Sequence, residues 1–173
     1  VTYVDSLGNL SYNNEKTVEV MQWYIDALYG DEPFAYTVTQ GQMLSKIISD
    51  GMILFYLTPD WQSKQFERDI PSLKGKMALT PLPAWEKGGC RTTSQGGTGC
   101  AITRQSKHRE LAWKLAKFLY FNQRNAGKMF RSLNILPPRK DMWNLPEIQA
   151  SNEYYSGQAI GKLYASIAPS VPP

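Results

Sequence analysis

Histidine is almost absent from this 173-residue sequence, and so are the motifs that many enzymes use. The single histidine, His108, lies between Lys107 and Arg109 at the expected start of a helix, where positive neighbours and the helix dipole disfavour a charged imidazole. The sequence has no Gly-x-Ser-x-Gly elbow, no His-Glu-x-x-His motif and no phosphate loop ending in Gly-Lys-Ser/Thr. It therefore predicts a chain that is not an enzyme and that holds no metal or cofactor.

Cysteine is also scarce. Cys90 and Cys100 are too few for a disulfide-stapled scaffold, and their spacing matches no Cys-x-x-Cys metal or redox motif. Two alternatives stay open at this point: one disulfide that closes the short loop between them, or two unpaired buried thiols. For this reason the cysteines do not fix the redox compartment.

Long apolar runs and a strong charge bias are missing as well. No apolar run approaches the ~18 residues of a membrane span. The 19 Lys and Arg against 15 Asp and Glu give a net charge of +4, which is less biased than nucleic-acid binders usually are. Basic residues do gather in two expected helices, but their spacing spreads them around each helix, so we predict no nucleic-acid partner; they are Arg104, Lys107, Arg109, Lys114, Lys117, Arg124, Lys128 and Arg131.

Apolar residues make up 42% of the sequence and aromatic residues 12%, enough for a packed core and typical of a globular domain. Apolar residues at three- and four-residue steps predict several helices. Their expected ranges are 13–30, with Asn13 or Asn14 as N-cap, 42–50, 62–68 and 123–133. A further helix has Ser106 as N-cap and an apolar side made of Leu111, Ala112, Leu115, Phe118 and Leu119, and two short helices follow Pro137-Pro138. We expect Gly51 to follow the second helix in a left-handed conformation.

Three further segments predict strands: 52–57, 77–82 and 100–103. The first is apolar at both parities, which is typical of a strand covered on both faces. Alternation of helices and strands predicts an α/β fold with mixed or parallel sheets flanked by helices. The first strand runs into Pro59, Asp60 and Trp61, and ligands of open α/β sheets collect at the carboxyl ends of strands.

The candidate ligand-binding residues follow from this placement. Five Trp and ten Tyr exceed what a core of this size needs, and aromatic rings stack on the apolar faces of sugars. Trp61 is the first candidate and Trp85, in a long glycine-rich loop over 84–99, is the second. The expected partners for sugar hydroxyls are Asp60, Arg91 and Gln95, while Gly96 and Gly97 permit either a tight bend or a close approach of ligand to backbone.

Three stretches of the sequence resemble a known family in their order and spacing. The first is Asp50-Gly51 with the predicted strand and Pro59-Asp60-Trp61; the second combines 79–83 with 96–102; the third runs from Ser106-Lys107 to Phe118-Leu119. They resemble the second half of the maltose-binding-protein-like, family 1 extracellular solute-binding proteins of carbohydrate ABC importers. The resemblance covers nearly the whole chain.

The resemblance implies part of a two-lobed periplasmic-binding-protein-like fold that closes around a sugar or oligosaccharide and hands it to a permease. By analogy, residues 1–78 belong to the C-terminal lobe, 79–136 to a return into the N-terminal lobe, and 137–173 to the C-terminal lobe again. It also implies a C-terminal fragment of an extracytoplasmic protein, a surface lipoprotein or a periplasmic receptor, whose parent is monomeric. The alternatives are a receptor for a non-sugar solute and a carbohydrate-active enzyme domain.

Overall fold

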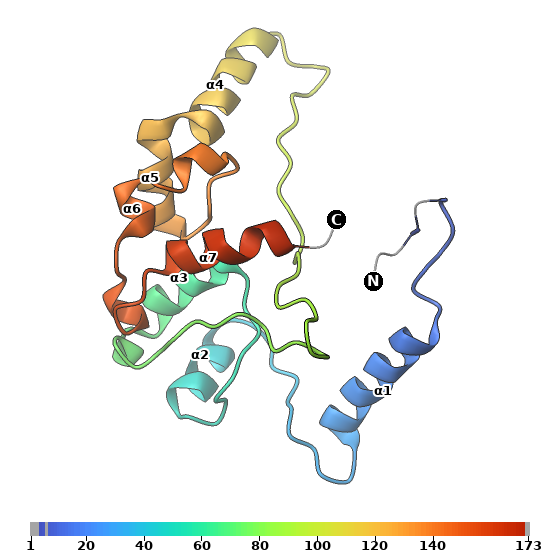
Figure 1. Cartoon of the computed structure of the whole chain (residues 1–173). Helices are drawn as coiled ribbons and strands as arrows, with labels where there is room; N and C mark the ends of the chain where they lie inside the picture. Colours follow the sequence, from blue (N-terminus) through green and yellow to red (C-terminus); the bar gives the residue numbers. More distant parts are fainter. Residues whose placement is uncertain (1–3, 6, 172–173) are drawn as a thin grey trace. The chain divides into compact units, whose positions relative to one another are not determined.

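A computed structural model describes residues 4, 5 and 7–171 of the chain (Figure 1). The described residues form two compact units, one that extends to Lys46 and one from Ile47 to Val171. Helix α2 (Gln42–Ser49) includes that boundary and is followed by Gly51 at φ +72°, as predicted. Among the described residues, no helix is long and apolar enough to cross a lipid bilayer.

Helix α1 (Glu15–Tyr29) dominates the first unit. The Asn14 side chain accepts a hydrogen bond from the Thr17 N–H at 3.0 Å and caps the helix, and Gly30 ends it. The chain then turns back, because the N–H groups of Phe34 and Ala35 both donate to the carbonyl oxygen of Ala27. The predicted helix and its caps are therefore confirmed, since local sequence signals are sufficient to define them.

Helices α3, α5, α6 and α7 form the packed part of the second unit (Figure 1). Their bounds are Asp60–Asp69, Gln123–Leu133, Pro146–Gln149 and Ile160–Ile167, and 3₁₀ turns occupy Pro71–Leu73, Lys140–Met142, Glu153–Tyr155 and Ala168–Ser170. Apolar side chains from all four helices are buried, and among them are Phe66, Phe130, Ile148 and Ile160. The two short helices expected after Pro137-Pro138 are α6 and α7.

Gly161 lets α7 approach α6 closely. A Cβ atom built on Gly161 would overlap the carbonyl oxygen of Ile148 and lie 2.6 Å from its Cγ2. Any side chain at this position would push the two segments apart, because real Cβ atoms do not approach so closely. The α6–α7 contact therefore depends on the missing side chain.

Helix α4 (Arg109–Phe121) begins later than predicted, with His108 rather than Ser106 at the N-cap. The Ser106 hydroxyl instead accepts a hydrogen bond from the His108 N–H at 3.3 Å, just ahead of the helix. Asn122 separates α4 from α5 and caps α5 by accepting from the Arg124 N–H at 2.9 Å. Apolar side chains of α4, such as Leu111, lie exposed, so the expected inward face of this helix is not buried within the described residues.

The predicted sheet does not form within the described residues, which hold only two isolated bridges, Val4 with Leu10 and Asn152 with Gln158. A strand is defined by a neighbour, and the 52–57 run has none here: Leu54 is 82% exposed and Phe55 89% exposed. At Leu79, in the 77–82 segment, one side chain takes the place of a strand partner. Gln158 accepts from the Leu79 N–H at 2.7 Å and donates to its carbonyl oxygen at 2.9 Å.

The two cysteines are free and exposed. The thiols are therefore unpaired, as in the second of the two sequence-based alternatives, but they are exposed rather than buried. The Sγ atom of Cys90 lies 3.6 Å from the carbonyl oxygen of Ser170, while Cys100 lies at the end of the open glycine-rich stretch. Both cysteines lie in loop segments, and loops run over the surface of a protein.

Candidate ligand-binding site

The first turn of α3 carries the two leading candidates, Asp60 and Trp61. The N-cap residue of α3 is Pro59, whose side chain cannot cap a helix. The Asp60 carboxylate takes over this function: Oδ1 accepts from the Trp61 N–H at 2.7 Å, and Oδ2 accepts from the Leu136 N–H at 3.4 Å. The start of α3 is thus tied to the chain that follows α5.

Ser63, which is fully buried, lies at the centre of a hydrogen-bond network beneath this turn. Its hydroxyl donates to the carbonyl oxygen of Asp60 at 2.6 Å. It also accepts from the Asn134 side-chain amide at 3.0 Å and from the Tyr164 hydroxyl at 2.9 Å. One donated and two accepted bonds use the full capacity of a serine hydroxyl. The Tyr155 hydroxyl adds a bond to the Ser63 carbonyl oxygen at 2.6 Å.

Glu67, one turn further along α3, extends the network. Its Oε1 accepts from the amides of Asn134 and Asn152, both at 2.8 Å, and its Oε2 pairs with the Lys64 ammonium group at 2.6 Å. Burial alone would raise the pKa of this carboxyl, but the hydrogen bonds from Lys64, Asn134 and Asn152 outweigh burial and hold the pKa below its usual value. Glu67 therefore stays ionised and fixes three donors.

Burial has the opposite consequence for the tyrosines of the network. It raises the pKa of Tyr155 and of Tyr164 well above the ordinary tyrosine value. Both phenols therefore stay protonated at physiological pH and act as hydrogen-bond donors to Ser63.

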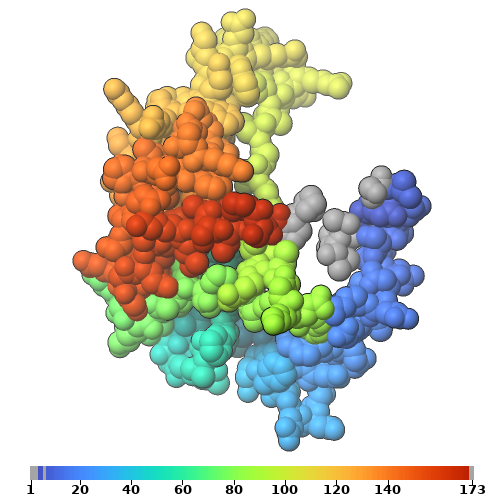
Figure 2. Space-filling model, in the orientation of Figure 1, coloured from blue at the N-terminus to red at the C-terminus, as the bar shows by residue number. Residues whose placement is uncertain are grey.

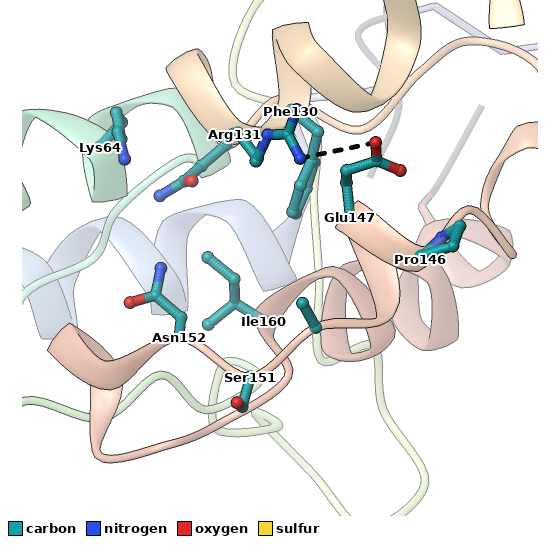
Figure 3. Close-up of a pocket in the computed structure, with 10 residues that line it drawn as sticks. Lys64, Phe130, Arg131, Pro146, Glu147, Ser151, Asn152 and Ile160 are labelled. Carbon is teal, nitrogen blue, oxygen red and sulfur yellow. Dashed lines mark ion pairs between the residues drawn. The ribbon is translucent and has the colours of Figure 1, made fainter. Parts of the chain in front are cut away.

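A concavity of about 490 Å³ lies between α3, α5, α6 and α7 (Figure 3). Its charged lining groups are paired: Arg131 with Glu147 at 3.5 Å, and Lys64 with Glu67 at 2.6 Å. The concavity therefore presents paired charges, apolar side chains and the uncharged polar side chains of Asn134, Ser151 and Asn152. None of the sequence-predicted ligand residues lines it.

Arg91 closes the loop that carries Trp85. The Nε of Arg91 donates to the Leu82 carbonyl oxygen at 2.9 Å and its Nη2 reaches the Pro81 carbonyl oxygen at 3.5 Å, while the Leu82 N–H donates to the Arg91 carbonyl oxygen at 2.9 Å. The guanidinium therefore has a structural function in the loop. Trp85 is 43% exposed.

Gln95, Gly96 and Gly97 are exposed. Figure 2 shows the yellow-green chain near residue 100 as a narrow column of atoms. Gly96 has φ +75°, and Cβ atoms built on Gly96 and Gly97 would meet only open space. Within the described part of the chain, no hydrogen bond joins this stretch to Asp60. The structure thus places Asp60 and Trp61 in one turn and leaves the other predicted residues on separate loop segments.

Sequence reasoning missed the network residues Ser63, Asn134 and Tyr164. Only Asn134 carried a signal: it caps α5 at φ +56°, and asparagine tolerates the left-handed conformation at a helix end shortly before Pro137-Pro138. Ser63 and Tyr164 lie in ordinary helical patterns, and nothing local marks them as partners.

The sequence family of this chain follows from a comparison with known families. Residues 3–155 match the model of the family described as bacterial extracellular solute-binding protein. The chain belongs to this family. The resemblance found in the sequence is therefore confirmed, and the family implies a two-lobed periplasmic-binding-protein-like fold, of which the described residues supply a helix-rich part.

Two curated relatives are both named arabinooligosaccharide-binding protein. The one from Halalkalibacterium halodurans is 34% identical over 157 residues, which cover 88% of this chain and 35% of the relative. The one from Bacillus subtilis is 32% identical over 155 residues, covering 88% of this chain and 36% of the relative. The chain thus spans about a third of the length of these relatives. No solved structure matches it.

Proposed function

We propose that the whole protein captures an arabinose-containing oligosaccharide outside the cytoplasm and delivers it, as a monomer, to the permease of an ABC importer. The observation that carries this proposal is the family match over residues 3–155, together with two relatives that are both named for arabinooligosaccharides. Cell-surface lipoprotein and periplasmic receptor are both compatible with it. The protein binds its ligand and carries out no reaction on it.

Trp61 is the proposed stacking platform, and Asp60 the proposed partner for sugar hydroxyls. An ionised carboxylate offers about four lone-pair sites. Asp60 accepts hydrogen bonds from two backbone N–H groups, which hold its carboxylate in place and leave further lone pairs available to sugar hydroxyls. Trp85, Arg91, Gln95, Gly96 and Gly97 are proposed to meet the ligand from the glycine-rich loop once the lobes close.

Three carboxylates of the chain do not fit the acid role of a glycosidase. Hydrolysis of a glycoside requires a pair of carboxyl groups, one of them with a raised pKa so that it can donate a proton. The pKa values of Glu67, Asp69 and Asp141 are all lowered. At Glu67 the hydrogen bonds from Lys64, Asn134 and Asn152 outweigh burial. At Asp69 and Asp141 a hydrogen bond from a neighbouring arginine favours the ionised carboxyl. These groups are suited to accept hydrogen bonds, not to act as acids.

The test is a calorimetric and tryptophan-fluorescence titration of the whole protein with arabino-, xylo- and malto-oligosaccharides. We expect saturable binding of the arabinose series. Trp61→Ala should weaken it by about 30-fold, the loss that corresponds to a buried aromatic contact of about 2 kcal/mol. Trp113→Ala is the matched control, because Trp113 is 52% exposed on α4 and belongs to no predicted site.

Failure of the folded protein to bind any of the three sugar series would overturn the proposed function. Binding that survives unchanged in Trp61→Ala would remove Trp61 from the site and leave the receptor in place. Equal losses in Trp61→Ala and Trp113→Ala would show that the effect is not specific to the first turn of α3.

A further inference from the structure

The peptide bond between Asp60 and Trp61 is held at both of its polar atoms. The Ser63 hydroxyl donates to the carbonyl oxygen of this peptide at 2.6 Å, and the Asp60 carboxylate accepts from its N–H at 2.7 Å. The plane of this peptide, together with the φ angle of Trp61, sets the direction in which the Trp61 Cα–Cβ bond leaves the backbone. Ser63 therefore holds the peptide from which the Trp61 side chain departs.

Ser63 is itself fixed from two distant parts of the chain. Asn134, at the end of α5, and Tyr164, on α7, both donate to its hydroxyl and so leave the serine proton only one direction, toward Asp60. Within the described residues, every buried side-chain nitrogen and oxygen has a partner. A buried polar network that is fully satisfied favours one geometry, whereas apolar residues of similar volume would supply comparable stability without that constraint.

We propose that Ser63, held by Asn134 and Tyr164, is a positioning residue that sets the orientation of Trp61 before the ligand arrives. This inference rests on the proposed function, because it assigns Trp61 to the sugar site. Preorganisation raises affinity, since the ligand does not bear the cost of ordering the ring. If the competent orientation fell to a tenth of the population, the apparent Kd would rise about tenfold.

The two tyrosines that contact opposite ends of α3 provide a matched pair for the test. The Tyr164 hydroxyl donates to Ser63 in the first turn, and the Tyr154 hydroxyl donates at 2.9 Å to the carbonyl oxygen of Ile70, the C-cap of the same helix. Tyr164→Phe and Tyr154→Phe each delete one such hydroxyl without creating a cavity. Only the first bears on the Asp60–Trp61 peptide.

The experiment labels the whole protein with 5-fluorotryptophan and assigns the Trp61 fluorine resonance through Trp61→Phe. We expect one sharp Trp61 resonance in the parent and in Tyr154→Phe, and a broadened or split one in Tyr164→Phe and Ser63→Ala. With arabino-oligosaccharides, Tyr164→Phe should raise Kd about tenfold and keep the full fluorescence change at saturation, while Tyr154→Phe should leave Kd unchanged.

An unchanged Trp61 resonance in folded Tyr164→Phe would overturn the positioning role. So would an equal loss of affinity in Tyr154→Phe, because that would indicate a general structural effect. If the parent binds none of the sugars, the proposed function fails and the fluorine resonance alone decides whether Ser63 positions Trp61. Tyr164→Phe keeps the test decisive if Ser63→Ala does not fold.

Discussion

Adding a single methyl group at Gly161 should destabilise the second unit, although alanine is a better helix former than glycine. The Cβ atom would overlap the backbone carbonyl oxygen of Ile148, which cannot rotate away as a side chain could. Overpacking of this kind costs about 1–3 kcal/mol. The gain in helix propensity offsets at most about 1 kcal/mol of it, and less near the first turn of a helix, where Gly161 lies.

Gly127→Ala in α5 is the control. A Cβ atom on Gly127 would meet only the end of the Glu147 side chain, at 2.6–2.9 Å, and that carboxylate can rotate away. Its rotation would give up the ion pair with Arg131, a partly exposed contact worth about 0–1 kcal/mol, while the helix gains up to about 1 kcal/mol. We therefore expect Gly127→Ala to leave stability nearly unchanged.

Urea unfolding of the full chain, followed by circular dichroism, compares the two variants. Gly161→Ala should lower the free energy of unfolding by about 1–2 kcal/mol, or lower Tm by roughly 2–8 °C, with an unchanged denaturant slope. Since α7 carries Tyr164, the same variant should also broaden the Trp61 fluorine resonance. Equal stabilities of Gly161→Ala and Gly127→Ala would refute the close approach of α7 to Ile148.

Three further outcomes are expected. The pKa of Glu67 is lower in the folded chain than in the unfolded one, so its contribution to stability is present above its unfolded pKa and is lost as the pH falls through the lowered value. The free energy of unfolding should therefore fall less steeply with decreasing pH in Glu67→Gln than in the parent. Parallel curves of stability against pH would contradict this. Asn134→Gly keeps the left-handed φ of 56° but removes the donors to Ser63 and Glu67, so it should destabilise the chain by roughly 1–3 kcal/mol in urea unfolding, and a neutral effect would count against the network. Cys90 and Cys100 are free and exposed, so both should react with a thiol reagent in the native, unreduced chain, whereas no reaction would indicate the disulfide.

The helices of this chain could be predicted from sequence because their signals are local. Asn14 and Gly30 mark the ends of α1, and the apolar spacing alone predicts the 123–133 range of α5. Each cap acts on backbone groups within a few residues, so the sequence in that window is sufficient. Helix α4 begins later than predicted, at Arg109, and the Ser106 hydroxyl accepts its hydrogen bond from the His108 N–H ahead of the helix.

The strands could not be predicted with the same success. The 52–57 run has the composition of a buried strand, but a strand also requires a neighbouring backbone to accept and donate its hydrogen bonds. At Leu79 that position is taken by the Gln158 side chain, which lies 79 residues further along the chain. No local pattern identifies such a substitute.

The sequence by itself determined the family, the caps of α1 and the adjacency of Asp60 and Trp61, because each of these depends on residues that are close together in the chain. Only the tertiary structure decided which side chains fix Asp60 and Trp61 through hydrogen bonds. The hydroxyl of Ser63 meets Asn134 across 71 residues and Tyr164 across 101 residues. Such contacts exist only once α3, α5 and α7 have packed, since burial is what makes each of these polar groups require a partner.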